Sequence, residues 1–434
     1  ITAPARQAAQ DAIADTFACM IAGQTDAAHR AVRAGLASGG MREGPCTLVG
    51  SGTALAPAAA MINGTAAHAL DFDDNFTPAL SHASAVLVPA LLAAGELRGA
   101  TGRDLVRAYL VGLEAQALVG QGVRRHHYTT GWHATSTVGT IGTAAGVAWL
   151  LGLDHDGLVR AMSLGVSMAA GVKGQFGTPA KPFHAGLAAR NAVDAALLAA
   201  EGLGGRRDIL EAPQGFGELF NGGNPAKWTI PQAAHIIEVE GLAPKLHPCC
   251  GSTHYAIDMV MDLRREHGFT AADVGSVHLV VGLANYRNLA YPDPQDEMEA
   301  RFSMQYCIAR ALTQDVLRLT DFTPQAVGDP HIRALLPRIS MEVMPPEEEN
   351  ASLRPSHRAR LTLTSGQVLE ARRAHARGTL AEPFSAAERH AKFLDCVTPH
   401  LGERKTEEAW LALNAIEDHP APANLLALAQ PAHA

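Results

Sequence analysis

The chain has 434 residues, of which 47% are hydrophobic and only 18% are charged, and its formal net charge is −8. This length predicts two domains, and the shortage of charged residues for a solvated surface favours a homo-oligomer. A negative net charge, without any Lys/Arg run longer than a pair, argues against nucleic-acid binding, which needs a basic face.

Six cysteines are scattered along the chain without C-x-x-C spacing, which predicts reduced thiols and a cytoplasmic protein. The uncharged run at residues 134–153 is as long as a membrane span. Its four glycines and several Thr and Ser residues favour a buried helix instead, so no membrane association is expected.

The first 200 residues show helical spacing of apolar side chains between short Gly- and Pro-containing loops. Thr101 and Asp104 have the spacing of a capping box, which marks a helix start. Helices are expected over about 4–22, 85–98, 101–120, 154–168 and 185–201.

Three glycines, Gly139, Gly142 and Gly146, resemble a dinucleotide-binding fingerprint. No strand precedes them and no acidic ribose partner follows. We therefore expect them to allow close contact between helices.

After residue 262 the pattern changes to the alternation that is typical of strands. Strands are expected at 274–281, 338–343 and 359–363, helices at 304–312 and 329–336, and a hairpin turn at 365–367. The predicted fold is therefore mainly α. A large all-helical domain (1–262 plus 386–434) carries a smaller α+β lid domain (263–385), inserted before the C-terminal helices.

Ionisable residues gather in four islands within apolar sequence: 68–82, 131–136, 177–184 and 245–254. Burying an unpaired charge costs on the order of several kcal/mol. We therefore expect the islands to meet in one buried site, the alternative being four separate surface loops. In that site His82, His133, Lys181 and Lys245 should line one cleft, with Asp71 close by.

The residue types in these islands suit proton transfer on a small anion. No G-x-S-x-G nucleophile motif occurs. Histidine can accept or donate a proton near neutral pH, and a lysine can stabilise an enolate-like intermediate. The sequence therefore predicts proton transfer α to a carboxylate of a di- or tricarboxylate, without a cofactor, and then elimination, decarboxylation or epimerisation. We expect His133 to be the base and Lys181 to stabilise the charge, with His82 as the alternative base.

A metal site is the competing interpretation. The run 71–74 is similar to the aspartate-rich Mg²⁺ motif of helical isoprenoid synthases, and Cys249, Cys250 and His254 could bind Zn²⁺. A second acidic motif is missing, and adjacent cysteines rarely bind one tetrahedral ion. We expect no metal.

The segment His68-Ala-Leu-Asp-Phe-Asp-Asp74, followed by His82, resembles the signature of the MmgE/PrpD family. That family includes 2-methylcitrate dehydratase, cis-aconitate decarboxylase and iminodisuccinate epimerase. Four more blocks match in the same order, so that the resemblance covers nearly the whole chain: 131–139, 177–186, 245–254 and 302–306.

The resemblance implies a helical domain with an α+β lid, a homodimer, and metal-free chemistry in the cleft between the domains. It also implies roles for individual residues. The candidate catalytic residues are His133, Lys181, His82 and Asp71, and the candidate substrate-binding residues are Asn75, Lys245, Cys250, His184 and Lys173.

Two positions depart from the decarboxylase members of the family. Cys250 stands where they have histidine, and Asn75 where they have a hydroxyl residue. Cys250 and Lys173 are more similar to the epimerase-like members. We therefore predict a cofactor-independent lyase that dehydrates or decarboxylates a small polycarboxylate. An epimerase of an amino-dicarboxylate such as iminodisuccinate, and a non-catalytic helical carboxylate-binding protein, are the alternatives.

Overall fold

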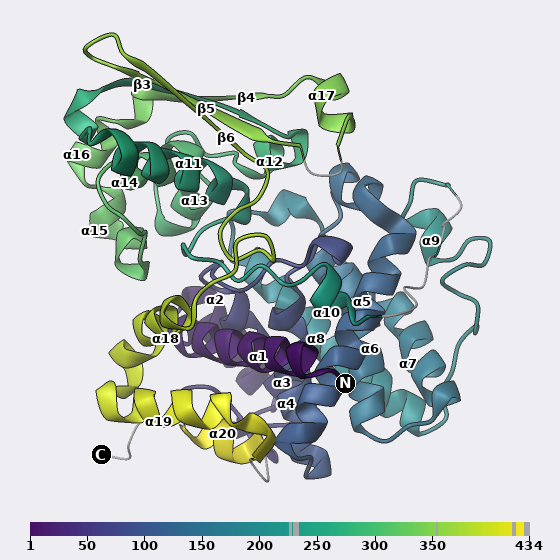
Figure 1. Cartoon of the computed structure of the whole chain (residues 1–434). Coiled ribbons are helices and arrows are strands. Elements are labelled where there is room, and N and C mark those ends of the chain that lie inside the picture. The colour runs from purple at the N-terminus through teal and green to yellow at the C-terminus, as the bar shows by residue number, and fades with distance from the viewer. Residues whose placement is uncertain (225–227, 229–233, 353–354, 419–421, 429–434) are drawn as a thin grey trace. The chain divides into compact units, whose positions relative to one another are not determined.

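The computed structural model describes the chain except for residues 225–227, 229–233, 353–354, 419–421 and 429–434 (Figure 1). The chain divides into two compact units. The first comprises residues 1–175, 179–244 and 386–434, and the second comprises 176–178 and 245–385. The described residues are mostly helical, with small sheets, which confirms the predicted fold class. Among them, no helix is both long enough and apolar enough to cross a membrane.

The first unit is built of helices. They are α1 (Ala3–Gly23), α2 (Ala27–Ser38), α3 (Ala56–His68), α4 (Ala83–Arg98), α5 (Gly102–Thr130), α6 (Ala134–Leu150), α7 (His155–Met168), α8 (Ala180–Ala200), α9 (Phe216–Leu219), α10 (Ile236–Val239), α18 (Ala386–Leu401), α19 (Glu403–Asn414) and α20 (Pro422–Leu428). A short antiparallel hairpin, β1 (Cys46–Thr47) and β2 (Thr53–Ala54), and the 3-10 turns η1 (Thr77–Ala79), η2 (Lys173–Gln175) and η6 (Ile416–Asp418) connect them.

Small residues bring α6 against α5 at close range. A Cβ at Gly142 would lie 2.4 Å from the backbone nitrogen of Gln116, and one at Gly146 would lie 2.9 Å from the carbonyl oxygen of Ala108. Both separations are too short for a side chain. These glycines therefore serve helix packing, as expected.

Two helix boundaries differ from the expectation. The capping box of Thr101 and Asp104 forms, but α5 continues to Thr130 instead of ending near residue 120. Gly120 does not end this helix: a Cβ there would lie 2.5 Å from the Cα of Ala79, so the glycine allows η1 to approach. Helix α8 begins at Ala180 instead of 185, which places the 181–184 segment in its first turn.

The second unit holds a four-stranded sheet in the order β4-β3-β5-β6. Its strands are β3 (Val274–Val281), β4 (Ile339–Val343), β5 (His357–Leu363) and β6 (Val368–Arg373). β4 pairs parallel to β3, whereas β5 pairs antiparallel to both β3 and β6. The three predicted strands are confirmed, and β6 is an additional one.

In the described part of the second unit, seven helices accompany the sheet: α11 (Gly251–His267), α12 (Leu283–Asn288), α13 (Glu297–Arg301), α14 (Met304–Ala311), α15 (Pro324–Val327), α16 (Pro330–Arg333) and α17 (Pro346–Asn350). The apolar side of α11, with Ile257 and Val260, shares one core with Leu279 and Leu361 of the sheet. The expected helix at 329–336 is only the short α16, followed by the turn η5 (Leu336–Arg338).

The units defined by contacts differ from the expected domains at residues 245–262. The expected boundary at residue 262 falls inside α11, and α11 packs on β5 and β6. The expected domain division therefore stays a prediction: a helical domain of residues 1–262 and 386–434, and a lid of residues 263–385.

Candidate active site

The acidic segment 71–74 belongs to the loop that joins α3 to α4, within the first unit. Asp71 has a φ of +52°, a left-handed conformation that few residues other than glycine adopt. Further along the loop, Phe76 and Ser81 exchange backbone hydrogen bonds. Backbone bonds of 2.9 Å in both directions tie Asn75 to Ala243. Backbone hydrogen bonds therefore hold the loop together internally, through Phe76 and Ser81, and join it to the segment at Ala243.

His68, the last residue of α3, is the centre of the site. Its Nδ1 lies 2.8 Å from Oδ2 of Asp73, and its Nε2 lies 3.0 Å from Nζ of Lys181. Burial lowers the pKa of His68 to about 3, so the ring is neutral. An ammonium can only donate, which assigns the tautomer: Nδ1–H donates to Asp73, and Nε2 accepts from Lys181.

Lys181 also pairs with the carboxylate of Asp71. It lies in the first turn of α8, and its side chain is buried. The ammonium therefore meets a carboxylate and a neutral imidazole in the same place. That is how a charge is retained inside a protein.

Asp73 holds two imidazoles. Besides His68, Nδ1 of His82 lies 3.3 Å from Oδ2 of Asp73. Burial opposes the charge of this carboxylate, but the imidazoles of His68 and His82 outweigh burial and hold its pKa well below the ordinary value. Asp73 is therefore an anion that orients both rings.

His82 comes directly before α4, and its ring centroid is 4.5 Å from that of His68. Its Nδ1 also lies 2.8 Å from the carbonyl oxygen of Asp74. Since this carbonyl can only accept, Nδ1 carries the proton when the ring is neutral, and Nε2 carries the lone pair. The side chain of His82 is 14% exposed, whereas those of His68 and Asp73 are fully buried.

The side chain of Asp74 contacts helix α4 instead of the histidines and Lys181. The hydroxyl and the backbone N–H of Ser84 donate to its carboxylate, and the phenol of Tyr109 lies 2.7 Å from that hydroxyl. Burial raises the pKa of Asp74 to about 7, against the opposing effect of the Ser84 hydrogen bonds. Asp74 thus fixes the start of α4 and has no contact with Lys181 among its described bonds.

His133 lies at the start of α6, and its backbone N–H donates to the carbonyl of Gly171. Its Nδ1 is 3.0 Å from Nδ1 of His184, and its ring stacks at 5.9 Å from that of His68. Burial, reinforced by the charge of Lys181, holds the pKa of His133 well below its ordinary value. Burial and Lys181 also lower the pKa of His184. One ring of this neutral pair must therefore donate to the other.

Three further candidates are Lys173 in the first unit and Lys245 and Cys250 in the second. Lys173 places its ammonium 3.3 Å from the carbonyl oxygen of Tyr128 and 3.6 Å from the centre of its ring. Lys245 and Cys250 belong to the second unit, where both are buried and Cys250 precedes the first turn of α11. Their part in substrate binding, like that of Asn75, stays a prediction.

The structure thus brings five predicted residues together around a histidine that the prediction left out. His82, His133, Lys181, His184 and Asp71 gather about His68 or its direct neighbours. In the sequence His68 stands at one end of the acidic island and begins the family signature, but it is not among the predicted site residues. Its position at a helix end, five residues before Asp73, is the sequence feature that could have indicated its role. Its other partner, Lys181, comes from a distant part of the chain.

A metal ion would have candidate ligands here, since one ligand atom from each of His68, Asp71, Asp73 and His82 lies within 4.8 Å of the others. Lys181, however, already contacts two of these four residues. An ammonium and a divalent cation repel each other at such a separation. These four side chains are therefore better suited to the ammonium of Lys181 than to a metal ion.

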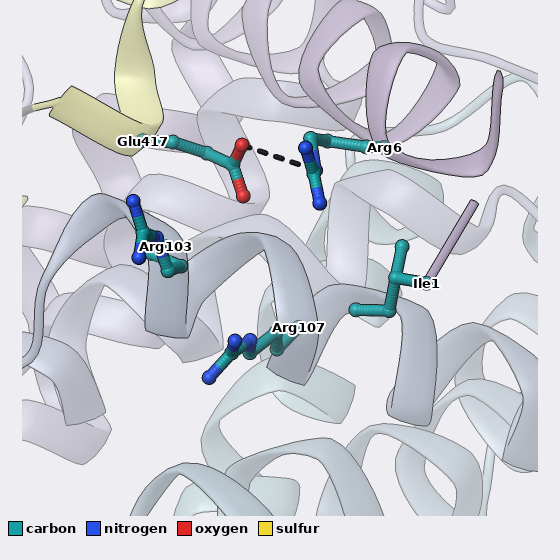
Figure 2. A pocket seen from close by; sticks show the side chains of 5 residues that line it. All are labelled: Ile1, Arg6, Arg103, Arg107 and Glu417. Carbon is teal, nitrogen blue, oxygen red and sulfur yellow. Dashed lines mark ion pairs between the residues drawn. The ribbon is translucent and has the colours of Figure 1, made fainter. Parts of the chain in front are cut away.

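A pocket of about 490 Å³ lies apart from this cluster, on the surface of the first unit (Figure 2). It is lined by Ile1, Arg6, Arg103, Arg107 and Glu417, and Arg6 pairs with Glu417 at 3.2 Å. Its lining side chains include three guanidinium groups and one carboxylate but no imidazole. This pocket is therefore not the candidate active site.

Two models of one protein family together match most of the chain. Residues 1–229 match the MmgE/PrpD N-terminal domain, and residues 247–418 match the MmgE/PrpD C-terminal domain. Human cis-aconitate decarboxylase is 31% identical over 297 residues, which are 66% of this chain and 61% of that protein. The mouse enzyme is 29% identical over 372 residues, 83% of this chain and 75% of that protein. A mitochondrial 2-methylcitrate dehydratase of Yarrowia lipolytica is 28% identical over 204 residues, 45% of this chain and 39% of that protein. The match spans about three fifths of the length of the human relative. The chain belongs to the MmgE/PrpD family.

Proposed function

We propose that this protein is a cofactor-independent lyase that acts on a small di- or tricarboxylate. The observation that carries the proposal is the position of Lys181, whose buried ammonium contacts His68 and Asp71 beside the rings of His133 and His82. The names of the relatives, cis-aconitate decarboxylase and 2-methylcitrate dehydratase, support the same reaction class.

In the proposed reaction His133 removes a proton from the carbon next to a carboxylate. Because its pKa is held well below the ordinary value, the ring is unprotonated at neutral pH, and when its Nδ1–H donates to His184 its Nε2 carries the lone pair. The electron pair left on carbon spreads onto the carboxylate, where the ammonium of Lys181 stabilises it. In an elimination this electron pair forms the double bond as hydroxide leaves the neighbouring carbon. A decarboxylation needs no prior deprotonation, because CO₂ leaves its bonding electrons on carbon; the ammonium of Lys181 stabilises that carbanion, and a histidine of the cluster delivers a proton to it.

Asp71 and Asp73 have supporting roles in this proposal. Asp71 holds the ammonium of Lys181, and Asp73 sets the tautomer of His68 and orients His82. We propose that Asn75, His184, Lys173, Lys245 and Cys250 bind the substrate, as the resemblance to the family implies.

Epimerisation is a second candidate, because two further imidazoles lie close to His68. The ring centroid of His82 lies 4.5 Å from that of His68, and the ring centroid of His133 lies 5.9 Å from it. One ring could remove a proton and the other return it to the opposite face of an amino-dicarboxylate. A protein that only binds carboxylates would need the cation but not several proton-transfer groups.

One experiment separates these reactions. The protein is incubated in D₂O with a panel of di- and tricarboxylates, and the mixture is followed by NMR. Elimination produces an alkene, decarboxylation produces CO₂, and epimerisation produces deuterium exchange with inversion. A Lys181→Met variant is the control. If the unaltered protein causes none of these changes in any acid of the panel, the lyase and the epimerase are both rejected, and carboxylate binding remains.

We also propose that the protein is a cytoplasmic homodimer. The low charged fraction supports self-association. The absence of disulfides among its six buried cysteines supports a reducing compartment. Light scattering coupled to size-exclusion chromatography tests the dimer, which a monomer mass at micromolar concentration would contradict.

A further inference from the structure

Lys392 of α18 buries its ammonium against the backbone of the acidic loop. Its Nζ donates to the carbonyl oxygen of Phe72 at 2.8 Å and lies 4.2 Å from the centre of the Phe72 ring. The carboxylate of Asp15, on α1, lies 2.7 Å away and balances the charge. The side chain of Lys392 is only 3% exposed.

The carbonyl that Lys392 binds has a particular place in the chain. Phe72 stands between Asp71, which pairs with Lys181, and Asp73, which orients His68. Asp71 has the left-handed backbone conformation that surrounding structure must hold in place. The orientation of the Phe72 peptide therefore sets the direction of both neighbouring carboxylates.

We propose that Lys392 is a positioning residue for the acidic loop. By fixing the Phe72 carbonyl it keeps Asp71 on Lys181 and Asp73 on His68, so that a C-terminal helix controls the geometry of the candidate active site. The predicted loss of turnover rests on the proposed function. The predicted change in the positions of Asp71 and Asp73 does not, because it can be measured without a substrate.

The alternative to a positioning role is that Lys392 only joins α18 to α1 through its ion pair with Asp15. The same two helices, which lie side by side in Figure 1, share a second ion pair close by. Nε of Arg389 is 3.4 Å from Oδ2 of Asp11. This pair offers a matched control for helix association alone.

The test compares three double variants, because removal of Lys392 alone would leave the charge of Asp15 uncompensated. K392M/D15N removes the charge pair and the donor to Phe72. K392Q/D15N removes the charge pair but keeps an N–H donor at that position. R389M/D11N removes the control pair. Each protein is labelled with ¹³C in its histidine rings, and NMR spectra and thermal unfolding are recorded.

We expect the signals of His68 and His82 to shift in K392M/D15N, to return toward their original positions in K392Q/D15N, and to stay unchanged in R389M/D11N. With an active polycarboxylate, K392M/D15N should lose about 10²-fold in kcat, as expected for a displaced catalytic geometry, with a much smaller change in KM. K392Q/D15N should recover most of this loss.

Unchanged histidine signals in a folded K392M/D15N protein would overturn the proposal. If that variant does not fold, K392L/D15L takes its place, and if neither folds, Lys392 is a folding residue and the proposal is abandoned. Shifted signals together with an unaltered protein that transforms no polycarboxylate would reject the proposed function and keep the positioning role.

Discussion

The ammonium nitrogen of Lys181 lies 3.0 Å from Nε2 of His68, although 113 residues separate them in the chain. Because His68 gives its Nδ1 proton to Asp73, its other nitrogen has only a lone pair to offer. The contact therefore gives Lys181 a fixed direction within the cluster, while Asp71 compensates its charge.

Replacement of Lys181 should impair both binding and turnover. In the proposed reaction the lysine meets a carboxylate of the substrate and also the charge that develops on it. We expect Lys181→Met to raise KM and to lower kcat together, measured as initial rates on the polycarboxylate found active in D₂O. A change in KM alone would show that Lys181 binds the ground state only.

Replacement of His133 should affect turnover alone. We expect His133→Ala to lower kcat by about 10²–10⁴-fold, the range of a general base, with little change in substrate affinity. His82→Ala, measured in parallel, should cost less. If His133→Ala keeps near-normal turnover while His82→Ala loses it, the base is His82.

Asp74 should make the protein less stable as the pH rises. Its pKa is raised to about 7 by burial, so the folded state binds the proton more tightly than the unfolded state does. Stability is therefore lost between pH 4 and 7, by about 1.4 kcal/mol for each pH unit through which only the folded form keeps the proton. Asn does not titrate, so the stability of Asp74→Asn relative to the unaltered protein should rise over this range and level off above pH 7.

The control for this measurement is Asp104→Asn. Hydrogen bonds from the backbone and side chain of Thr101 outweigh desolvation and lower the pKa of Asp104. A lowered carboxyl pKa contributes stability that is present at higher pH and lost on acidification. The relative stability of Asp104→Asn should therefore change with pH in the opposite sense to that of Asp74→Asn. The free energy of unfolding of each variant relative to the unaltered protein is measured by urea unfolding at each pH. If the two variants show the same pH dependence, Asp74 does not have a raised pKa.

Metal analysis should find no stoichiometric ion in the purified protein, and a chelator should leave its activity unchanged. The ammonium of Lys181 occupies the position next to His68 and Asp71 that a divalent cation would need. Lys181→Met removes this repulsion, so the variant should bind Zn²⁺ more tightly than the unaltered protein in calorimetric titration. One Zn²⁺ per chain in the unaltered protein, with activity lost to a chelator, would restore the metal interpretation.

Local patterns in the sequence predicted much of the architecture. Thr101 and Asp104 form the expected capping box, and the alternating segments at 274–281 and 359–363 are strands. These features depend on neighbouring residues, through hydrogen bonds of one helical turn or the two-residue period of a strand. The grouping of ionisable residues in apolar sequence likewise indicated a buried site, because an isolated charge is costly to bury.

Long-range packing decided the rest. Gly120 looked like a helix end, yet the close approach of Ala79 explains why a glycine stands inside α5. The central place of His68 depends on Asp73, five residues away, and on Lys181 from another helix. Lys392 reaches the acidic loop from 320 residues further along the chain. Sequence spacing cannot reveal such contacts, because the pKa and the hydrogen-bond role of a buried group depend on partners that only the folded chain brings within a few ångströms.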